Sequence, residues 1–261
     1  MASSNSNFKI LSQPPVGKTL LKYDIKQHPQ SQSLEIPPVF IAAVQAREDV
    51  FVAMYDELTF ENNLDYDDPR SIHFVAFSNT PDEEDIEPNS ITDIQTRNKF
   101  VLRAIGTLRF IPFPQYHQHP PPGMVFDADS LRASAAVENS AELFLGIPEY
   151  KPDRPTKFHD GIEAYIKVGR MCVIKEWRGK GVMDELLRTG YKWLTENKGW
   201  TTGTIGGEER FGGWKGLICA HADINAKRSW ERNGFVVDED MGCWWILGIQ
   251  HICMWKRIEL D

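Results

Sequence analysis

The chain has 261 residues, a formal net charge of −8 and a pI of about 5.4, which suits one domain with a sizeable core and room for insertions. The absence of a basic stripe argues against a protein that binds a nucleic-acid duplex through clustered Lys and Arg side chains. No apolar run approaches the roughly 18 residues of a membrane span, and the polar N-terminus lacks the apolar core of a signal peptide. We therefore expect neither a nucleic-acid partner nor a membrane partner.

The four cysteines are widely spaced and form no Cys-x-x-Cys pair. Three of them, Cys172, Cys219 and Cys253, lie in apolar runs, and the fourth is Cys243. This pattern is typical of reduced, mostly buried thiols in an intracellular protein. We predict a cytoplasmic protein, and the sequence excludes neither a nuclear location nor a homodimer.

The N-terminal part predicts a flexible lead-in over residues 1–16, followed by a single domain over 17–261. The stretch Lys18–Ile25 has strand character. After Pro37 and Pro38, apolar residues recur at helical spacing, which predicts a helix over Pro38–Phe60 that is either continuous or broken around Arg47–Asp49.

Two strands are expected next, at Ile72–Phe77 and Phe100–Ile111, with a charged surface loop between them. An insertion rich in proline follows at about 112–160, with a helix-compatible piece at Asp129–Leu145. So long a connection is often a lid or a binding loop. His117 and His119 have a spacing that could serve a metal, but no Cys, Asp or Glu stands close by in the sequence, so we predict exposed loop histidines and no metal site.

The C-terminal half mixes strands and helices without strict alternation. Its patterns predict strands at Gly161–Ile174, Leu217–Asp223, Phe235–Leu247 and Ile249–Ile258, and helices at Val182–Asn197 and Asn225–Asn233. The last two strands would pair around a turn at Gly248. This order predicts an α+β fold with α/β-like layers, in which helices cover both faces of a central mixed, mostly antiparallel sheet.

The most informative stretch is Met171–Leu194, which reads as strand, loop and helix in that order. An apolar run is followed by Arg178-Gly179-Lys180-Gly181, after which one apolar helical face begins at Val182. Glycines let backbone N–H groups approach a ligand, and a helix N-terminus carries about half a positive charge. The arrangement predicts a pyrophosphate site. A plain turn with basic side chains is the alternative.

This loop resembles the Arg/Gln-x-x-Gly-x-Gly/Ala signature of GNAT acetyltransferases, with Met183 in place of the final Gly or Ala. A second segment, from Asn225-Ala226 through Trp230 to Gly234-Phe235, resembles the family's Asn…Ala…Tyr-x-x-x-Gly-Phe segment. Further residues are similar to the bacterial ElaA-like branch of the family: Arg47, Glu61, Asp65, Asp68, His73, Gly248, His251 and Met254.

The resemblance implies that acetyl-CoA binds in a V-shaped split between the strands Ala164–Ile174 and Leu217–Asp223. It implies that the backbone of Arg178–Met183 holds the pyrophosphate: Arg178, Gly179, Lys180, Gly181, Val182 and Met183. Backbone groups of Cys172, Val173 and Ile174 would pair with the pantetheine arm, and Asn225 and Trp230 would lie along the other side of the cofactor.

The implied reaction is direct attack of a neutral amine on the thioester. A lysine-like amine has a pKa of about 10.4 and must lose a proton first, so a general base is needed. Lys167 stands where the family often has a Glu, which leaves Glu163, Asp223 and His251 as candidate bases. Trp230 stands where the family usually has a Tyr that acts as general acid. An indole N–H can donate a hydrogen bond but cannot protonate the leaving thiolate.

The acceptor pocket would lie between the first helices and the last hairpin, with Tyr55, Glu57, Glu61, Trp244 and Trp245 as candidate substrate-binding residues. Aromatic walls and carboxylates suit a small-molecule amine such as an amino sugar or a polyamine. A protein N-terminus or lysine is the alternative acceptor. Two alternatives belong to other functional classes: a protein that binds CoA as a sensor without turnover, and an unrelated nucleotide-binding domain.

Overall fold

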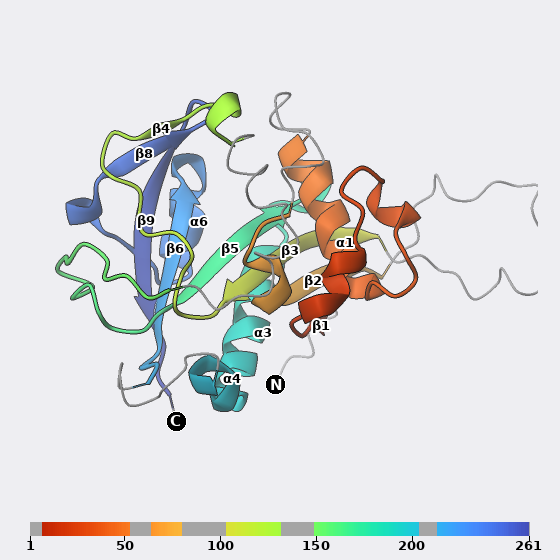
Figure 1. Cartoon of the computed structure of the whole chain (residues 1–261), viewed down its shortest axis with the longest axis horizontal. Helices are drawn as coiled ribbons and strands as arrows, with labels where there is room; N and C mark the ends of the chain where they lie inside the picture. The colour runs from red at the N-terminus through yellow and green to blue at the C-terminus, as the bar shows by residue number, and fades with distance from the viewer. Residues whose placement is uncertain (1–6, 53–63, 80–102, 132–148, 204–212, 261) are drawn as a thin grey trace, which may run out of the picture.

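The computed structural model describes residues 7–52, 64–79, 103–131, 149–203 and 213–260. Within these residues, one sheet of nine strands runs in the order β1-β2-β3-β5-β6-β9-β8-β4, with β7 also paired to β9 (Figure 1). The β5–β6 and β4–β8 pairs are parallel and the other pairs are antiparallel. The expected mixed, mostly antiparallel sheet is therefore confirmed.

The strands are β1 (Phe8–Gln13), β2 (Ile72–Ser78), β3 (Ala104–Ile111), β4 (Val125–Phe126), β5 (Ile166–Val173), β6 (Leu217–Asp223), β7 (Val236–Val237), β8 (Cys243–Ile246) and β9 (Ile249–Arg257). The α-helices are α1 (Pro38–Arg47), α3 (Val182–Glu196), α4 (Lys198–Gly203) and α6 (Lys227–Arg232). A short helical piece at residues 128–131 begins where the sequence predicts a helix in the insertion, and the remainder of that prediction lies outside the described residues.

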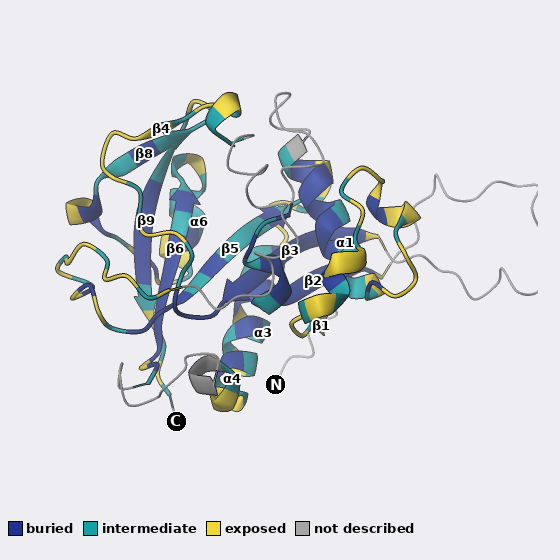
Figure 2. Cartoon of the chain, in the orientation of Figure 1, coloured by how far each residue is buried: buried dark blue, intermediate teal, exposed yellow. Residues whose placement is uncertain are grey.

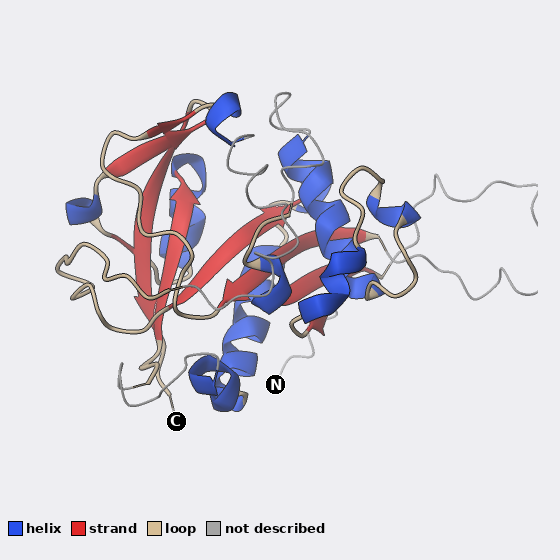
Figure 3. Cartoon of the chain, in the orientation of Figure 1, coloured by secondary structure: helices blue, strands red, loops and turns tan. Residues whose placement is uncertain are grey.

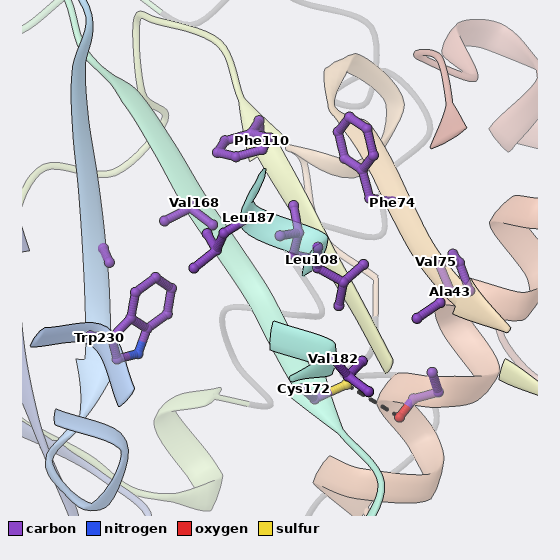
Figure 4. Packing of buried hydrophobic residues seen from close by; sticks show 14 of the residues in the cluster. Ala43, Phe74, Val75, Leu108, Phe110, Val168, Cys172, Val182, Leu187 and Trp230 are labelled. Atoms are coloured by element: carbon purple, nitrogen blue, oxygen red, sulfur yellow. Dashed lines mark hydrogen bonds between the residues drawn. The ribbon is translucent and has the colours of Figure 1, made fainter. Parts of the chain in front are cut away.

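Helices cover both faces of the sheet, as Figure 3 shows. Side chains of a strand alternate between faces, so β2 and β3 turn Phe74 and Phe110 to one side and His73 and Arg109 to the other. Helix α3 packs on the Phe110 side, where Gly190 faces the ring so closely that a Cβ would overlap it. Figure 4 shows this packing, and Figure 2 shows the central strands buried along most of their length.

Several sequence predictions are wrong near the N-terminus. Residues 8–13, assigned to the flexible lead-in, form edge strand β1 paired with β2. The Lys18–Ile25 stretch contains a 3₁₀ helix at Gly17–Lys22, whose Leu20 packs in a small apolar cluster with Phe40. The helix predicted from Pro38 is an α-helix to Arg47 and continues as a π-helix over Glu48–Val52, and the rest of the predicted helix lies outside the described residues.

The predicted strand Phe235–Leu247 is divided into β7, a 3₁₀ turn at Glu239–Met241, and β8. The interruption follows from Asp238, whose buried carboxylate accepts hydrogen bonds from the Thr156 hydroxyl at 2.6 Å and the Trp255 indole at 2.8 Å. The turn around Gly248, at φ 76°, joins β8 to β9 as predicted. No helix in the described ranges combines the length and apolar character needed to cross a bilayer.

The proline-rich insertion packs against the sheet. Its strand β4 extends the sheet beside β8. The side chain of His119 is only 2% exposed and its ring stacks on Tyr165 at 5.8 Å. The expectation of an exposed loop histidine at this position is therefore wrong, because the sequence does not reveal that the insertion folds back onto β5 and β9.

Candidate active site

Strands β5 and β6 separate after a short parallel contact. They pair only from Ile166 to Val168 on β5, against Ile218 to Ala220 on β6. Beyond this point β5 continues beside β3 to Val173, while β6 continues beside β9 to Asp223. The facing edges therefore diverge, as Figure 1 shows, and form the V-shaped split that the sequence resemblance implies.

The split begins beside a bulge in β5. The β3–β5 register shifts between Thr107 and Arg109, and Arg170 adopts a positive φ of 51°. A bulge bends its strand and increases the local twist. It therefore accounts for the divergence of β5 from β6.

An exposed loop connects β5 to α3. Gly179 and Gly181 have φ values of 74° and 79°, in the region that only glycine enters readily. No heavy atom lies within 4 Å of the Cβ position at either glycine apart from chain neighbours. The loop residues Arg178 to Gly181 are exposed, and the space beside both glycines is open.

The N-terminus of α3 supplies free donors to this loop. Its first i→i−4 bond runs from the Glu185 N–H to the Gly181 carbonyl at 3.0 Å. The N–H groups of Val182, Met183 and Asp184 precede that bond, and they have no partner further back along the helix axis. Together with the helix dipole they form a site suited to a diphosphate.

The basic loop side chains stay close to the backbone. The Arg178 Nε donates to the Val173 carbonyl at 3.0 Å, and the Lys180 ammonium lies 5.0 Å from the Trp177 ring centre. The backbone groups that were predicted to pair with pantetheine lie at the end of β5, and one of them, the Ile174 N–H, donates to the Ile105 carbonyl at 3.0 Å. The Val173 carbonyl and the Ile174 N–H therefore already have partners within the protein, and the contacts of this segment with pantetheine stay predictions.

Cys172 faces α1, and its thiol donates to the Ala46 carbonyl at 3.4 Å (Figure 4). Burial raises the pKa of this thiol to about 12, which excludes a thiolate nucleophile at this position near neutral pH.

The α6 region borders the split on the β6 side. Asn225 is exposed and donates through its N–H and side-chain Nδ2 to the Asp223 carboxylate, at 2.7 and 2.9 Å. Trp230 is only 4% exposed and packs edge-on against Phe235 at 4.8 Å. Its side chain belongs to the core, and the predicted contact of Trp230 with the cofactor stays a prediction.

Two of the predicted bases meet at the end of β6. Asp223 lies opposite His251 in the β6–β9 register, and the His251 ring stacks near the fully buried Trp244 at 6.3 Å. The His251 Nδ1 lies 3.0 Å from the Ile249 carbonyl. Because a carbonyl only accepts, Nδ1 carries the proton and Nε2 keeps its lone pair. Burial lowers the pKa of His251, so a neutral imidazole with a basic Nε2 is present at pH 7.

The remaining predicted site residues lie elsewhere or outside the description. Glu163 stands before β5, at the end remote from the loop, and forms an ion pair with Arg257 at 2.7 Å. Trp245 is partly buried on β8. The predicted substrate-binding residues Tyr55, Glu57 and Glu61 lie outside the described residues.

A buried charge network lies beside the bulge. Asp68 accepts a hydrogen bond from Arg47 at 2.8 Å and forms an ion pair with Arg109 at 2.6 Å. Asp65 accepts from Arg109 at 2.7 Å and from Arg170 at 2.8 Å. Burial alone would raise the pKa of the Asp68 carboxyl, but Arg109 and Arg47 outweigh burial and hold this pKa below its usual value. Through Arg170 the bulge in β5 is joined to this network.

Asp65, Asp68, Arg47 and His73 are indicated by the sequence through the resemblance to the ElaA-like branch, whereas Arg109 and Arg170 are not. A usable signal existed for Arg109, because a charged residue in the apolar run Phe100–Ile111 needs a buried partner.

His73 gives this network a pH dependence. Its Nδ1 accepts from Arg47 at 3.1 Å, and burial, followed by the Arg47 charge, lowers the pKa of His73 to about 3. Below pH 6.5 the His73 imidazole binds a proton in the unfolded chain but stays neutral in the folded protein. The free energy of unfolding therefore decreases as the pH falls. We expect wild-type protein to lose about 2 kcal/mol more than His73→Gln in urea unfolding between pH 7 and pH 5. Equal losses would contradict a neutral, buried His73.

No protein-family model and no curated protein matches the sequence. Among solved structures, the chain is similar to Escherichia coli ElaA, with 13% identity, a TM-score of 0.42, and coverage of 96% of this chain and 99% of that chain. It is similar to an acyl-CoA N-acyltransferase from Pseudomonas aeruginosa, with 13% identity, a TM-score of 0.43 and coverage of 95% and 99%.

A third similar structure is the CoA-dependent acyl-homoserine lactone synthase BjaI with SAM and isopentyl-CoA, with 13% identity, a TM-score of 0.46 and coverage of 97% and 84%. At such low identities and TM-scores, the fold assignment depends on the sheet order and the β5–β6 split. These features confirm the GNAT fold that the sequence resemblance implies.

Proposed function

We propose that the chain is an acyl-CoA-dependent N-acyltransferase that transfers an acetyl group from acetyl-CoA to the primary amine of a small molecule. The observation that carries this proposal is the open glycine loop at the N-terminus of α3, next to the β5–β6 split. Free N–H groups, a helix dipole and basic side chains lie together there, and this combination favours binding of a CoA pyrophosphate.

The transfer would take place in a ternary complex. The neutral amine attacks the thioester carbonyl, the C–S bond breaks, and CoA leaves as a thiolate that takes up a proton. His251 is our choice of general base, because its Nε2 lone pair lies at the C-terminal end of β6 and Asp223 stands opposite. Glu163 is less suited, since Arg257 already holds its carboxylate.

The test of the function is thiol release from acetyl-CoA across amino sugars, polyamines, arylamines and peptides. Turnover with a small amine supports the proposal, and turnover with peptides alone would favour a protein N-acetyltransferase. CoA binding without turnover on any amine would favour a CoA-binding sensor. Longer acyl-CoA donors, run in parallel, test whether acetyl is the preferred group.

The base assignment predicts a specific kinetic change. His251→Gln should lower kcat by about 10²- to 10⁴-fold, the usual contribution of a general base. It should also remove the inflection that the imidazole contributes to the pH–rate profile, because the glutamine amide does not titrate, and leave the dependence set by the pKa of the amine itself. Glu163→Gln is the competing variant, and a larger kcat loss there than in His251→Gln would move the base to Glu163.

A further inference from the structure

Four side chains that bind transition metals meet away from the glycine loop. His119 comes from the insertion, Cys219 and His221 from β6, and Cys253 from β9. Their four ligand atoms all lie within 4.8 Å of one another. Strand geometry explains three of them: Cys219 and His221 are two residues apart on one face, and Cys253 lies opposite His221 in the β6–β9 register.

The separations are close to those of a tetrahedral site. The Cys219 and Cys253 sulfurs are 3.7 Å apart, which equals the edge of about 3.7 Å expected for two thiolates on one zinc ion. The Cys253 sulfur lies 3.9 Å from His119 Nδ1. The His119 Nδ1–His221 Nε2 distance is 2.8 Å, shorter than the edge of about 3.3 Å, because one imidazole donates a hydrogen bond to the other.

The surroundings also suit a metal ion. Cys219 and Cys253 are fully buried and form no disulfide, and the His119 side chain is 2% exposed. His119 Nε2, on the far side of the ring from the cluster, is buried without a hydrogen-bond partner and lies 3.7 Å from the Asp153 carboxylate. A histidine that ligates through one nitrogen commonly offers the other to a carboxylate. Asp153 is held in place by the Tyr165 hydroxyl at 2.9 Å.

We propose that His119, Cys219, His221 and Cys253 bind one zinc ion as a structural site. Two sulfur and two nitrogen ligands match zinc in type and number, and four protein ligands leave no open position for catalysis. Binding converts both thiols to thiolates and releases their protons. The ion would fix the proline-rich insertion to β6 and β9, whether or not the chain transfers an acyl group. The prediction of no metal site rested on sequence neighbours of His119, whereas its partners lie about a hundred or more residues further on.

The experiment is elemental analysis of untagged protein purified without chelator. We expect about one zinc per chain in wild-type protein. Cys219→Ser and Cys253→Ser should lose the metal, and Asp153→Asn should weaken zinc affinity by about 10-fold or more, as measured by competition with a chromophoric chelator. His117→Ala and Cys243→Ser are matched controls outside the cluster and should retain full occupancy.

A second measurement covers ligand variants that fail to fold. Cobalt(II) added to chelator-treated wild-type protein should give intense visible bands of a tetrahedral centre and a near-ultraviolet thiolate charge-transfer band. Wild-type protein without zinc and without these bands would overturn the proposal, as would metal retained in both cysteine variants. A Cys219–Cys253 disulfide found by mass spectrometry in freshly purified protein would also overturn it and would assign the pair a redox role.

Discussion

Asp68→Asn is expected to lower the free energy of unfolding by about 3–5 kcal/mol, the usual cost of breaking a buried ion pair from one side. Arg47 and Asp68 are both fully buried, and Arg109 is nearly so. Without the Asp68 charge, Arg47 and Arg109 each lose a buried ion pair with this carboxylate. Urea unfolding of the two proteins at pH 7 measures the difference.

Asp67→Asn is the matched control for this prediction. Asp67 carries the same charge one residue earlier, but its partner Arg70 is partly exposed, at 14% for each side chain. Its loss should cost about 1 kcal/mol or less. If Asp68→Asn does not fold, Arg47→Met combined with Asp68→Asn should recover folded protein, because the cation that pairs with Asp68 is then removed as well. Equal destabilisation by Asp67→Asn and Asp68→Asn would refute a special role for the buried network.

The sequence predicts correctly those elements whose apolar pattern is complete within a short stretch of consecutive residues. The predicted strand Leu217–Asp223 opens on the apolar run Leu217–Ala220 and is β6 with the same bounds, and α3 begins at the predicted Val182. The glycine loop could be predicted for the same reason, since strand, loop and helix follow one another directly. By contrast, β1 is an edge strand in which Phe8 alone is buried, so its apolar pattern is too weak to identify.

The structure shows that the missed site residues come together over long sequence separations. Arg170 reaches Asp65 across 105 positions, and His119 reaches His221 across 102. No local period encodes such contacts, because they depend on how the sheet orders its strands. One signal was nevertheless available: Cys219 and His221, two residues apart in a predicted strand, must point to the same face.

The second large effect is expected at the glycine loop, where Gly181→Glu should abolish measurable CoA binding while the fold is kept. The Cβ position at Gly181 meets no neighbouring atom within 4 Å, so a side chain fits there without a clash. Its carboxylate would stand at the N-terminus of α3, where it would repel the pyrophosphate and occupy the same N–H donors. Calorimetric titration with CoA measures the loss.

Backbone strain needs its own control, because Gly181 has a φ of 79° and any other residue pays about 1–2 kcal/mol in that conformation. Gly181→Ala carries the same strain without the charge. We expect Gly181→Glu to bind CoA at least about 10-fold more weakly than Gly181→Ala, a difference of about 1.4 kcal/mol. If the two variants bind CoA equally well, the N-terminus of α3 does not hold the diphosphate. The acyltransferase proposal would then lose the observation that carries it, while the zinc site would be unaffected.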